Sequence, residues 1–250
     1  MTTNVFCKKK NILASDSRWS FKPINDRVAA TFAVAYIDNT GYDKIVYDGD
    51  TGFIFAGSID VIDKWRDWVI SPLQQSLKRP DVADDFSICM TDLDTGDILY
   101  EHGQKVSGEF CRMAGTGAKA AYECWDVNGD AKTAVISATK ADVFSGGEVK
   151  YLEGGNRKNN LNFTVSKLFI KEQFLKKGMV MYTATNQAPI PLEQAKSDPR
   201  IQQLVSAIEK DTISAEAPSG FDPVVWTPAD ENRLDAALAT RAAKRAALNC

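Results

Sequence analysis

The sequence predicts an α+β fold in which two antiparallel sheets lie between layers of helices. Pairs of short apolar runs, separated by turn residues, recur through the first hundred residues and indicate hairpins. Two helical stretches follow, one over residues 118–125 and one reaching residue 141, and extended sequence then resumes through residue 152. Strand pairs, a helix pair and further strand together are typical of an α+β protein.

Composition is that of an ordinary globular protein. The chain has 250 residues, of which 44% are hydrophobic and 25% charged, and its net charge is −3. This charge gives no general attraction to nucleic acid or to membrane surfaces, and no apolar run approaches the roughly 20 residues that span a bilayer. Lys8, Lys9 and Lys10 are not followed by the apolar region of a secretory signal. We therefore expect a cytoplasmic protein without nucleic-acid or membrane partners.

Cysteine and histidine usage limits the possible chemistry. The five cysteines are widely scattered and match neither a disulfide framework nor a zinc site, so free thiols are expected. His102 is the single histidine, which excludes a multi-histidine metal site, and its polar surroundings predict a surface turn. A Ser-His-Asp site would have to use this one residue. We expect no metal, no cofactor and a catalytic base other than histidine.

The first elements are predicted to be hairpins. Residues 4–7 and 12–14 are apolar runs on either side of a polar turn, and folding them together brings Asp16 back toward the N-terminus. Residues 19–42 resemble an inserted loop, with a possible strand over residues 29–37. A second hairpin is expected over residues 44–57, with its turn at Asp48-Gly49-Asp50.

Helix signals follow the second hairpin. Ser58 can cap a helix, which Pro72 should end or kink. One face of that helix would carry Val61, Ile62, Trp65, Trp68 and Val69. Residues 86–93 and 97–100 predict a third hairpin, and Asp130 can cap the second helix of the later pair.

The last hundred residues give weaker signals. Residues 163–170 and 179–183 are predicted strands, a helix should start at Ser197-Asp198-Pro199, and residues 213–226 resemble a linker. Residues 227–249 predict a helix with Pro228 at its first position. Its Ala and Leu stripe is too small to form a core alone, so we expect it to pack on a neighbouring subunit. The expected division is a main domain over residues 1–185 and a C-terminal helical extension over residues 186–250.

The N-terminus carries a candidate nucleophile. Met1 precedes Thr2, and an initiator Met before a small residue is normally removed. Thr2 would then hold a hydroxyl nucleophile beside its own α-amine, a recognised activating base. An α-amine titrates at about 7.7–8.0, so part of it is neutral and able to accept a proton near neutral pH.

Six short motifs occur in a fixed order along the first 152 residues. They are Thr2-Thr3, Ala14-x-Asp16-Ser17-Arg18, Lys44-Ile45-Val46, Phe55-Ala56-Gly57-Ser58, Gly115-Thr116-Gly117 and Asp142-x-Phe144-Ser145-Gly146-Gly147. This ordered set resembles proteasome β subunits and their bacterial relatives, the threonine peptidases of the N-terminal-nucleophile hydrolases. The resemblance implies the fold of that family, a four-layer αββα sandwich of two antiparallel sheets, here with a C-terminal extension.

The resemblance also implies catalytic roles for five residues. Thr2 would attack the peptide carbonyl and form an acyl-enzyme. Lys44 would place a cation beside the nucleophile and lower the pKa of its amine and hydroxyl. Asp16 would pair with Lys44 and offset the desolvation of its ammonium group. Asp142 and Ser145 would form hydrogen bonds around the Thr2 amine. Taken singly, each could instead be an ordinary terminal, strand-edge or turn residue.

Substrate-binding residues follow from the same resemblance. The backbone N–H of Gly57 would be an oxyanion donor, and Ser58, Thr116 and Gly146 would lie with it along the substrate, which would pair as an added β-strand. Thr116 stands where the family often has Ser, a change that keeps the hydroxyl. Phe144 stands where the family usually has Tyr.

The spacing between Asp16 and Lys44 departs from the family pattern, because these residues stand farther apart here. We place the extra length in residues 19–42, since residues 44–57 keep nearly their expected length. If the insertion lies elsewhere, Lys22 is the competing lysine.

The leading hypothesis is a cytoplasmic, self-compartmentalising threonine peptidase in a ring or helical stack of identical subunits. Its substrate would be a peptide or an unfolded protein, and an ATP-dependent unfoldase could deliver it. An alternative is a catalytically inactive scaffold or regulatory subunit, which a retained Met1 would favour because Thr2 would then lack a free amine. A related amidase that acts on a small amide stays open as a third interpretation.

Overall fold

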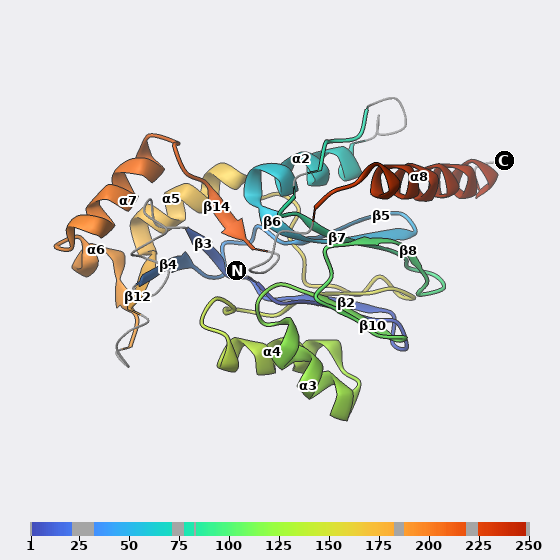
Figure 1. Cartoon of the computed structure of the whole chain (residues 1–250), viewed down its shortest axis with the longest axis horizontal. Helices are drawn as coiled ribbons and strands as arrows, with labels where there is room; N and C mark the ends of the chain where they lie inside the picture. Colours follow the sequence, from blue (N-terminus) through green and yellow to red (C-terminus); the bar gives the residue numbers. More distant parts are fainter. Residues whose placement is uncertain are drawn as a thin grey trace.

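The computed structural model describes residues 2–21, 33–71, 78–82, 84–182, 188–218 and 225–248. Two antiparallel sheets lie face to face, and helices cover both outer faces (Figure 1). The predicted αββα layer order is confirmed. No helix in the described part of the chain is long and apolar enough to cross a bilayer.

The first sheet is built around the predicted N-terminal hairpin. β1 (Asn4–Cys7) pairs with β2 (Ile12–Ser15) on one side and with β10 (Cys111–Ala114) on the other. β11 (Lys150–Glu153) lies outside β2, and β9 (Val106–Ser107) lies outside β10. The sheet order is therefore β11-β2-β1-β10-β9.

The second sheet has the order β13-β12-β4-β3-β14-β6-β7-β8, with β5 also paired to β6. Its strands are β3 (Trp19–Phe21), β4 (Ala33–Ile37), β5 (Ile45–Asp48), β6 (Thr51–Ser58), β7 (Ser87–Asp92), β8 (Ile98–His102), β12 (Met179–Tyr182), β13 (Ile190–Pro191) and β14 (Ala215–Ala217). The expected hairpins β5–β6 and β7–β8 are present.

Neighbouring side chains along a central strand belong to different hydrophobic cores. In β1, Val5 and Cys7 pack toward the helices, whereas Phe6 packs into the space between the sheets. In β6, Ile54 faces that same space, and its neighbours Phe53 and Phe55 join the core on the far side of the second sheet. Successive side chains of a strand point to opposite faces, so each central strand contributes to two cores.

Two helices cover the first sheet. α3 (Ala118–Asn128) and α4 (Ala131–Ala141) form the predicted pair, and the Asp130 carboxylate accepts a hydrogen bond from Thr133 N at 2.8 Å as the cap of α4. Their buried side chains are mostly alanines, which let the helices approach the sheet closely. The two helices are antiparallel, so the start of α3 lies beside the end of α4, where a Cβ atom on Gly117 would lie 3.1 Å from Ala138.

The outer face of the second sheet carries α2 (Ile59–Ile70), α5 (Lys167–Lys177), α6 (Leu192–Ala195) and α7 (Pro199–Glu209). The Ser58 side chain caps α2 as predicted, and Ile62, Trp65 and Val69 are buried beneath it. The cap residue after α2 is Ser71, and the expected stop at Pro72 lies outside the described residues.

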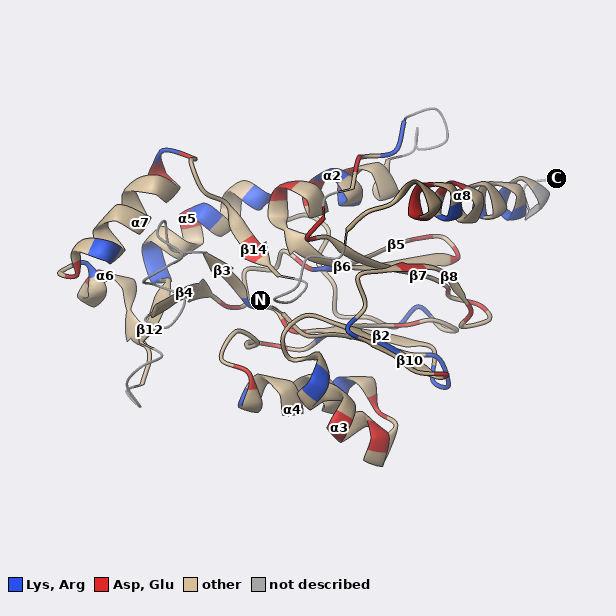
Figure 2. Cartoon of the chain, viewed as in Figure 1, with Lys and Arg blue, Asp and Glu red and all other residues tan. Residues whose placement is uncertain are grey.

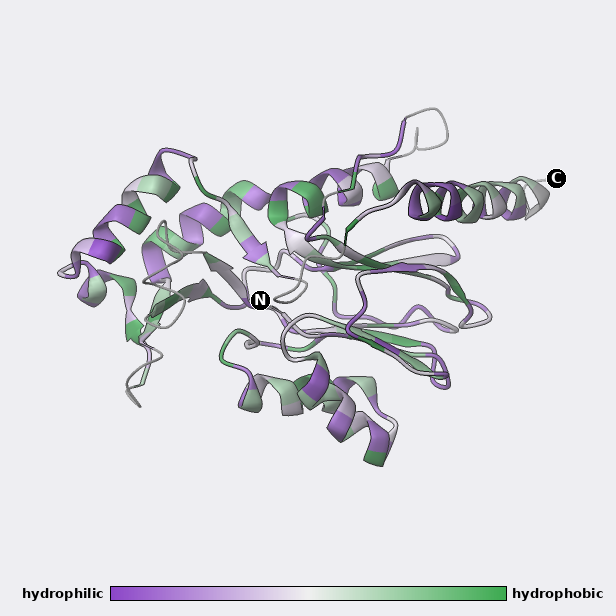
Figure 3. Ribbon diagram, in the orientation of Figure 1, coloured by the Kyte–Doolittle hydropathy of each residue, from purple (hydrophilic) through white to green (hydrophobic). Residues whose placement is uncertain are grey.

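α8 (Pro228–Leu248) packs on its own chain, which corrects the expectation that it needs a neighbouring subunit. Leu234 is fully buried in the core of the second sheet. Lys244 Nζ lies 2.6 Å from Asp92, and Arg241 lies 2.8 Å from Asp48. Basic residues of α8 thus face the acidic turns of the two hairpins below it (Figure 2). Figure 3 shows hydrophilic residues gathered near the start of the helix and a mixture of weakly apolar and hydrophilic residues along the rest of it.

Four local predictions are wrong. Residues 19–42 are not simply a loop, because β3 and β4 lie in the second sheet. The predicted strand 163–170 instead runs into helix α5, where Ile170 and Phe174 are buried one turn apart. The predicted linker 213–226 contains β14. The expected extended segment from residue 143 begins as a turn, and its strand is limited to β11.

His102 is buried rather than exposed. Only 5% of it is accessible, since the start of α8 and the ring of Trp226 cover the end of β8. Its Nδ1 atom lies 3.7 Å from Asp230. The polar loop after His102 suggested a surface position, but the covering residues come from the other end of the chain.

Candidate active site

One oxygen of Asp16 connects the candidate nucleophile with the candidate lysine. Asp16 directly follows β2, and its Oδ1 atom accepts a hydrogen bond from Thr2 Oγ1. The same oxygen accepts the backbone N–H of Thr3 at 2.8 Å and Lys44 Nζ at 3.0 Å. Thr2, Asp16 and Lys44, which the family resemblance placed in one site, are therefore in direct contact through one carboxylate.

The second oxygen of Asp16 is held by the backbone. Oδ2 accepts the N–H groups of Arg18 and Gly146, each at 3.1 Å. The N–H of Ser17 in turn donates to the carbonyl of Gly146 at 3.1 Å. These bonds join the end of β2 to the loop that follows α4, and they fix the orientation of the carboxylate.

Lys44 reaches the site from the residue just before β5. Its carbonyl accepts the N–H of Phe55 at 2.9 Å, which extends the pairing of β5 with β6 by one residue. Its ammonium group also donates to the Asp16 carbonyl at 2.9 Å and lies 5.4 Å from the Trp19 ring. Burial lowers the pKa of Lys44, and the Asp16 carboxylate opposes that shift. The competing residue, Lys22, lies outside the described residues.

A second carboxylate organises the hydroxyl groups nearby. Asp142 Oδ2 accepts hydrogen bonds from Thr116 Oγ1 at 2.6 Å and from Ser145 Oγ at 2.7 Å. Ser145 Oγ also lies 2.7 Å from Thr3 Oγ1. Because a serine hydroxyl has one proton to donate, the Thr3 hydroxyl is the donor in that pair when Ser145 donates to Asp142. Ser145 therefore meets Thr3, the residue after the candidate nucleophile.

The loop over Gly115 and Gly117 fits closely around the N-terminal segment. Gly115 has φ +93°, a conformation that favours glycine, and a Cβ atom there would collide with the Thr2 carbonyl oxygen. A Cβ atom on Gly117 would collide with Thr3 Oγ1. Only glycine at both positions lets this loop hold Thr2 and Thr3 in place, which gives a physical reason for the Gly-Thr-Gly motif.

Gly57 and Ser58, two predicted substrate-binding residues, are engaged by their own chain. Gly57 has φ +135° and pairs with Ala217, while Ser58 pairs with Glu216. The Ser58 side chain accepts the N–H of Asp60 as the cap of α2. The edge of β6 at which a substrate strand was expected is therefore occupied by β14.

Two residues of the site had no role in the sequence-based prediction. Thr3 contributes both its N–H and its hydroxyl, as described above. Arg18 donates to Asp38 through two nitrogens at 2.8 Å and to the Val143 carbonyl at 2.7 Å, and it stacks over the Tyr36 ring. Arg18 stood inside one of the motifs, but its acidic partner is far away in the sequence and could not be identified there.

The site is closed to solvent. Thr2 is 0% exposed, and Asp16, Lys44 and Ser145 are each 1% exposed. Within the described residues there is no group of three or more His, Cys, Asp or Glu side chains placed to hold a metal ion. The arrangement is thus a buried network of hydroxyl, carboxylate and ammonium groups, which is chemistry suited to proton transfer and nucleophilic attack.

Comparison with known proteins gives one kind of match. No family model matches the chain, and no curated protein sequence matches it. Seventy chains of solved structures match it. Among them is eukaryotic HslV from Trypanosoma brucei, with 17% sequence identity and a TM-score of 0.35, over 61% of this chain and 99% of that chain. Identity at this level transfers no residue roles, which must come from the contacts of this chain.

Proposed function

We propose that this chain is a threonine peptidase in which the Thr2 hydroxyl attacks peptide bonds. The observation that carries the proposal is the contact of Thr2 Oγ1 with Asp16 Oδ1, the same oxygen that accepts Lys44 Nζ. The ordered motifs that resemble proteasome β subunits support the same assignment. In this proposal a hydroxyl, a carboxylate and an ammonium group act together at one buried point.

The proposed mechanism requires that Thr2 becomes the first residue through removal of Met1. Its α-amine then accepts the hydroxyl proton as Oγ1 attacks the substrate carbonyl carbon. The resulting tetrahedral intermediate collapses to an ester on Thr2, and the departing amine takes a proton from the Thr2 ammonium group. Water activated by the same amine hydrolyses the ester and frees the enzyme for another cycle.

Electrostatics would assist each proton transfer. A cation at Lys44 favours the deprotonated forms of the Thr2 amine and hydroxyl because it lowers their pKa. Asp16 keeps that cation in place and orients the hydroxyl through its hydrogen bond. Gly146 acts on the reaction through Asp16, since its N–H holds the second carboxylate oxygen.

The remaining predicted residues would position the attacking group and the substrate. Asp142 fixes the hydroxyls of Ser145 and Thr116, and Ser145 extends the network to Thr3. We propose that the backbone N–H of Gly57 stabilises the oxyanion, an interaction that can contribute about 2.7–4 kcal/mol. Ser58 would continue the same strand edge along the substrate after β14, which pairs there in the described form, has left it.

We also propose that the protein acts in the cytoplasm as a self-compartmentalising homo-oligomer, in a ring or helical stack. Its substrates would be peptides or unfolded proteins, and an ATP-dependent unfoldase is a candidate partner. An open peptidase site would endanger other proteins, so enclosure by assembly suits this activity. Support for this part of the proposal comes from the resemblance to proteasome β subunits.

A second candidate is a catalytically inactive scaffold with the same fold. The complete burial of Thr2 favours it, since no substrate carbonyl can reach a hydroxyl without an exposed surface. Retention of Met1 would favour it as well, because the proposed base would then be an amide.

Intact-mass analysis combined with a peptide-hydrolysis assay tests the proposal. We expect a mass that lacks Met1, hydrolysis by the natural chain, and labelling by threonine-directed electrophiles. Thr2→Ala should abolish turnover and labelling while leaving the melting temperature nearly unchanged, and Thr2→Ser is the matched control that keeps a hydroxyl. Undiminished turnover in Thr2→Ala would overturn the mechanism, and a retained Met1 without turnover would support the scaffold.

A further inference from the structure

β14 fills a slot between two strands that both lead to the candidate active site. Ala215 pairs with Phe21 of β3, and Ala217 pairs with Gly57 of β6, with both pairings antiparallel. From Ala215 to Ala217, the paired residues on β3 descend in number from Phe21 toward Asp16. The paired residues on β6 likewise descend from Ser58 toward Phe55. The C-terminal end of β14 therefore points toward the site, and in Figure 1 its arrowhead ends near the N-terminus.

The pairings on β6 show how near Ala217 lies to the site. Lys44 and Ala217 lie along the same edge of β6. The Lys44 carbonyl accepts a hydrogen bond from the backbone N–H of Phe55, and Ala217 pairs with Gly57. Two residues along a strand span about 6.6 Å. The backbone of Ala217 thus lies one pleat beyond that of Lys44, whose side chain reaches the carboxylate that holds Thr2.

The strand is short and carries small side chains. Ala215 is 4% exposed and Ala217 is 0% exposed, and both belong to the main core. Pro218 follows immediately and has no backbone N–H, so it cannot continue the ladder. A strand of three residues makes few contacts with its neighbours. A peptide that makes more contacts in the same position would therefore compete with it.

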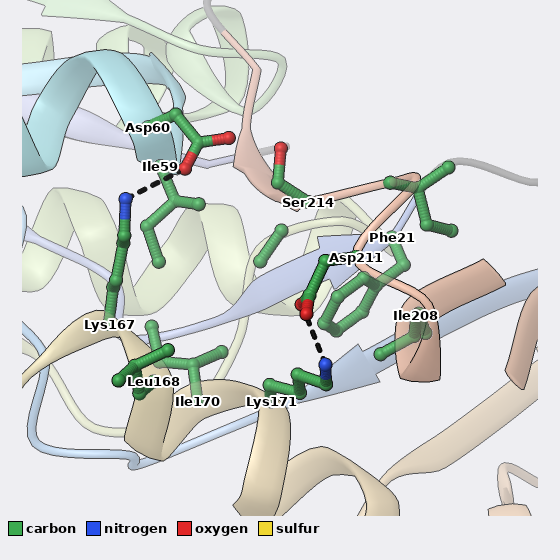
Figure 4. A pocket seen from close by; sticks show the side chains of 12 residues that line it. Phe21, Ile59, Asp60, Lys167, Leu168, Ile170, Lys171, Ile208, Asp211 and Ser214 are labelled. Carbon is green, nitrogen blue, oxygen red and sulfur yellow. Dashed lines mark hydrogen bonds and ion pairs between the residues drawn. The ribbon is translucent and has the colours of Figure 1, made fainter.

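A cavity lies beside Ala215. It has a volume of about 80 Å³, several times what one water molecule needs. Figure 4 shows the apolar side chains of Phe21, Ile59, Ile170 and Ile208 around it, with ion pairs Lys167–Asp60 and Lys171–Asp211 beside them. The methyl group of Ala215 leaves this apolar space unfilled.

The surroundings of Ala217 differ. It is completely buried, and it is not among the residues that line the cavity beside Ala215. The slot thus has room for a larger side chain at the Ala215 register but not at the Ala217 register.

We propose that β14 is a built-in occupant of the peptide-binding slot between β3 and β6, and that an extended peptide displaces it when an aliphatic side chain at the Ala215 register fills the adjacent cavity. The ligand class is an extended peptide with an aliphatic residue at that register and a small residue two positions later. In the form described here the slot is closed to such a peptide. The identification of the displacing peptide as a substrate rests on the proposed function, whereas its binding does not.

Peptide binding to the full-length protein tests this proposal without requiring catalysis. The protein carries Thr2→Ala, which removes the nucleophile, and Glu216→Pro, which removes an N–H from the middle of β14 and weakens its hold on the slot. The probes are fluorescent pentapeptides with the sequence of residues 213–217 (Ile-Ser-Ala-Glu-Ala), with Leu at the third position, or with Leu at the fifth. Fluorescence anisotropy gives the dissociation constants.

We expect the peptide with Leu at the third position to bind at least about tenfold more tightly than the native sequence, because three further carbon atoms become buried. The peptide with Leu at the fifth position should show no binding. Thr2→Ala with Glu216→Ala is the matched control, because it keeps the N–H and should bind all probes more weakly than the Glu216→Pro protein. Equal affinities for the three peptides, or equal binding by the two proteins, would overturn the proposal.

A second measurement decides the question if Glu216→Pro fails to fold. In the natural chain, Ala215→Leu should raise the melting temperature by filling the cavity, and Ala217→Leu should lower it through overpacking. A fall in both variants would overturn the assigned shape of the slot. The experiments also distinguish failure of the peptidase proposal from failure of the β14 proposal. Peptide binding as expected, together with no hydrolysis by the natural chain, would overturn only the proposed peptidase function.

Discussion

Lys44 Nζ lies 3.0 Å from Asp16 Oδ1, and neither side chain has any exposure to solvent. Each charge is therefore compensated mainly by the other and by the hydrogen bonds around them. A buried pair of this kind contributes little net stability as a whole, yet removal of one partner leaves an uncompensated charge in the core. This asymmetry gives the first prediction.

Lys44→Ala should lower the free energy of unfolding by about 3–5 kcal/mol and abolish peptide hydrolysis, because Asp16 would be left without its cation. Chemical denaturation followed by fluorescence measures the first effect. Lys8→Ala is the matched control, since its ion pair with Asp97 is exposed and should contribute too little to resolve. Lys22→Ala should leave the free energy of unfolding and peptide hydrolysis nearly unchanged. Loss of hydrolysis in Lys22→Ala but not in Lys44→Ala would show that the insertion lies elsewhere in the sequence.

Asp16→Asn should remove activity and destabilise the fold. The carboxylate accepts five hydrogen bonds on its two oxygens, whereas an asparagine amide offers one oxygen and turns the other position into a donor. At least one buried N–H group then loses its acceptor, which costs about 1–3 kcal/mol. Unchanged unfolding midpoints for Asp16→Asn would contradict the central place of this carboxylate.

Gly115→Ala should reduce both the melting temperature and the rate of hydrolysis. Its Cβ atom would meet the Thr2 carbonyl, and the backbone at φ +93° is strained for alanine, so the first residues must move. Gly155→Ala is the matched control, because nothing lies within 4 Å of its Cβ position. Similar behaviour of the two variants in thermal denaturation and peptide assays would show that the loop does not position Thr2.

Asp230 should make α8 sensitive to acid. Its carboxylate accepts a hydrogen bond from the Thr227 hydroxyl at 2.6 Å, and this bond, with Arg233 and His102 nearby, lowers the pKa of Asp230 to about 2. A depressed pKa means that the stabilisation is complete above the unfolded pKa near 3.9 and is lost as the pH falls toward 2.

The comparison of natural protein with Asp230→Ala measures this effect. At pH 7 the variant should be less stable by about 1 kcal/mol, as for loss of other helix caps. The difference between the two proteins should shrink between about pH 4 and pH 2, because the carboxylate becomes protonated in the natural chain. A difference that stays constant over this range would contradict the assigned role.

Deletion of residues 228–250 should destabilise the subunit itself. The helix buries Leu234 and brings Arg241 and Lys244 to the acidic turns of two hairpins. Leu234→Ala should already cost about 2–5 kcal/mol, and Leu238→Ala, at a half-buried position, should cost less. Thermal denaturation and light scattering separate the possibilities, since an equally stable but less assembled truncation would restore the hypothesis of packing on a neighbour.

Local signals explain which parts of the fold the sequence could predict. The hairpin from Asn4, the capped helix after Ser58 and the helix begun by Asp130 each follow from turn or cap residues within a few positions. The meeting of Asp16 with Lys44 was expected from the family resemblance, since no local pattern connects two residues on either side of a long intervening segment.

The missed elements depend on contacts that a local pattern does not contain. Ala215, Glu216 and Ala217 lack the β-branched and aromatic residues typical of strands, and the partner Ser20 lies 196 residues away in the sequence. The apolar run 163–170 is short, and periodicity alone does not separate a strand from a buried helix at that length. The burial of His102 likewise requires Trp226, which sequence alone could not place beside it.

The insertion of β14 between β3 and β6 also has a consequence for the order of folding. Ribosomal synthesis delivers the N-terminal strands first, and Ser20 and Glu216, which are 196 residues apart, must meet before β14 can pair with β3. Until then β3 has one unpaired edge, and β6 has an unpaired edge at Gly57 and Ser58, beyond its pairing with β5. Unpaired strand edges are templates for association with other chains. A nascent chain that stalls before residue 215 would therefore be aggregation-prone, and the space between β3 and β6 would stay open.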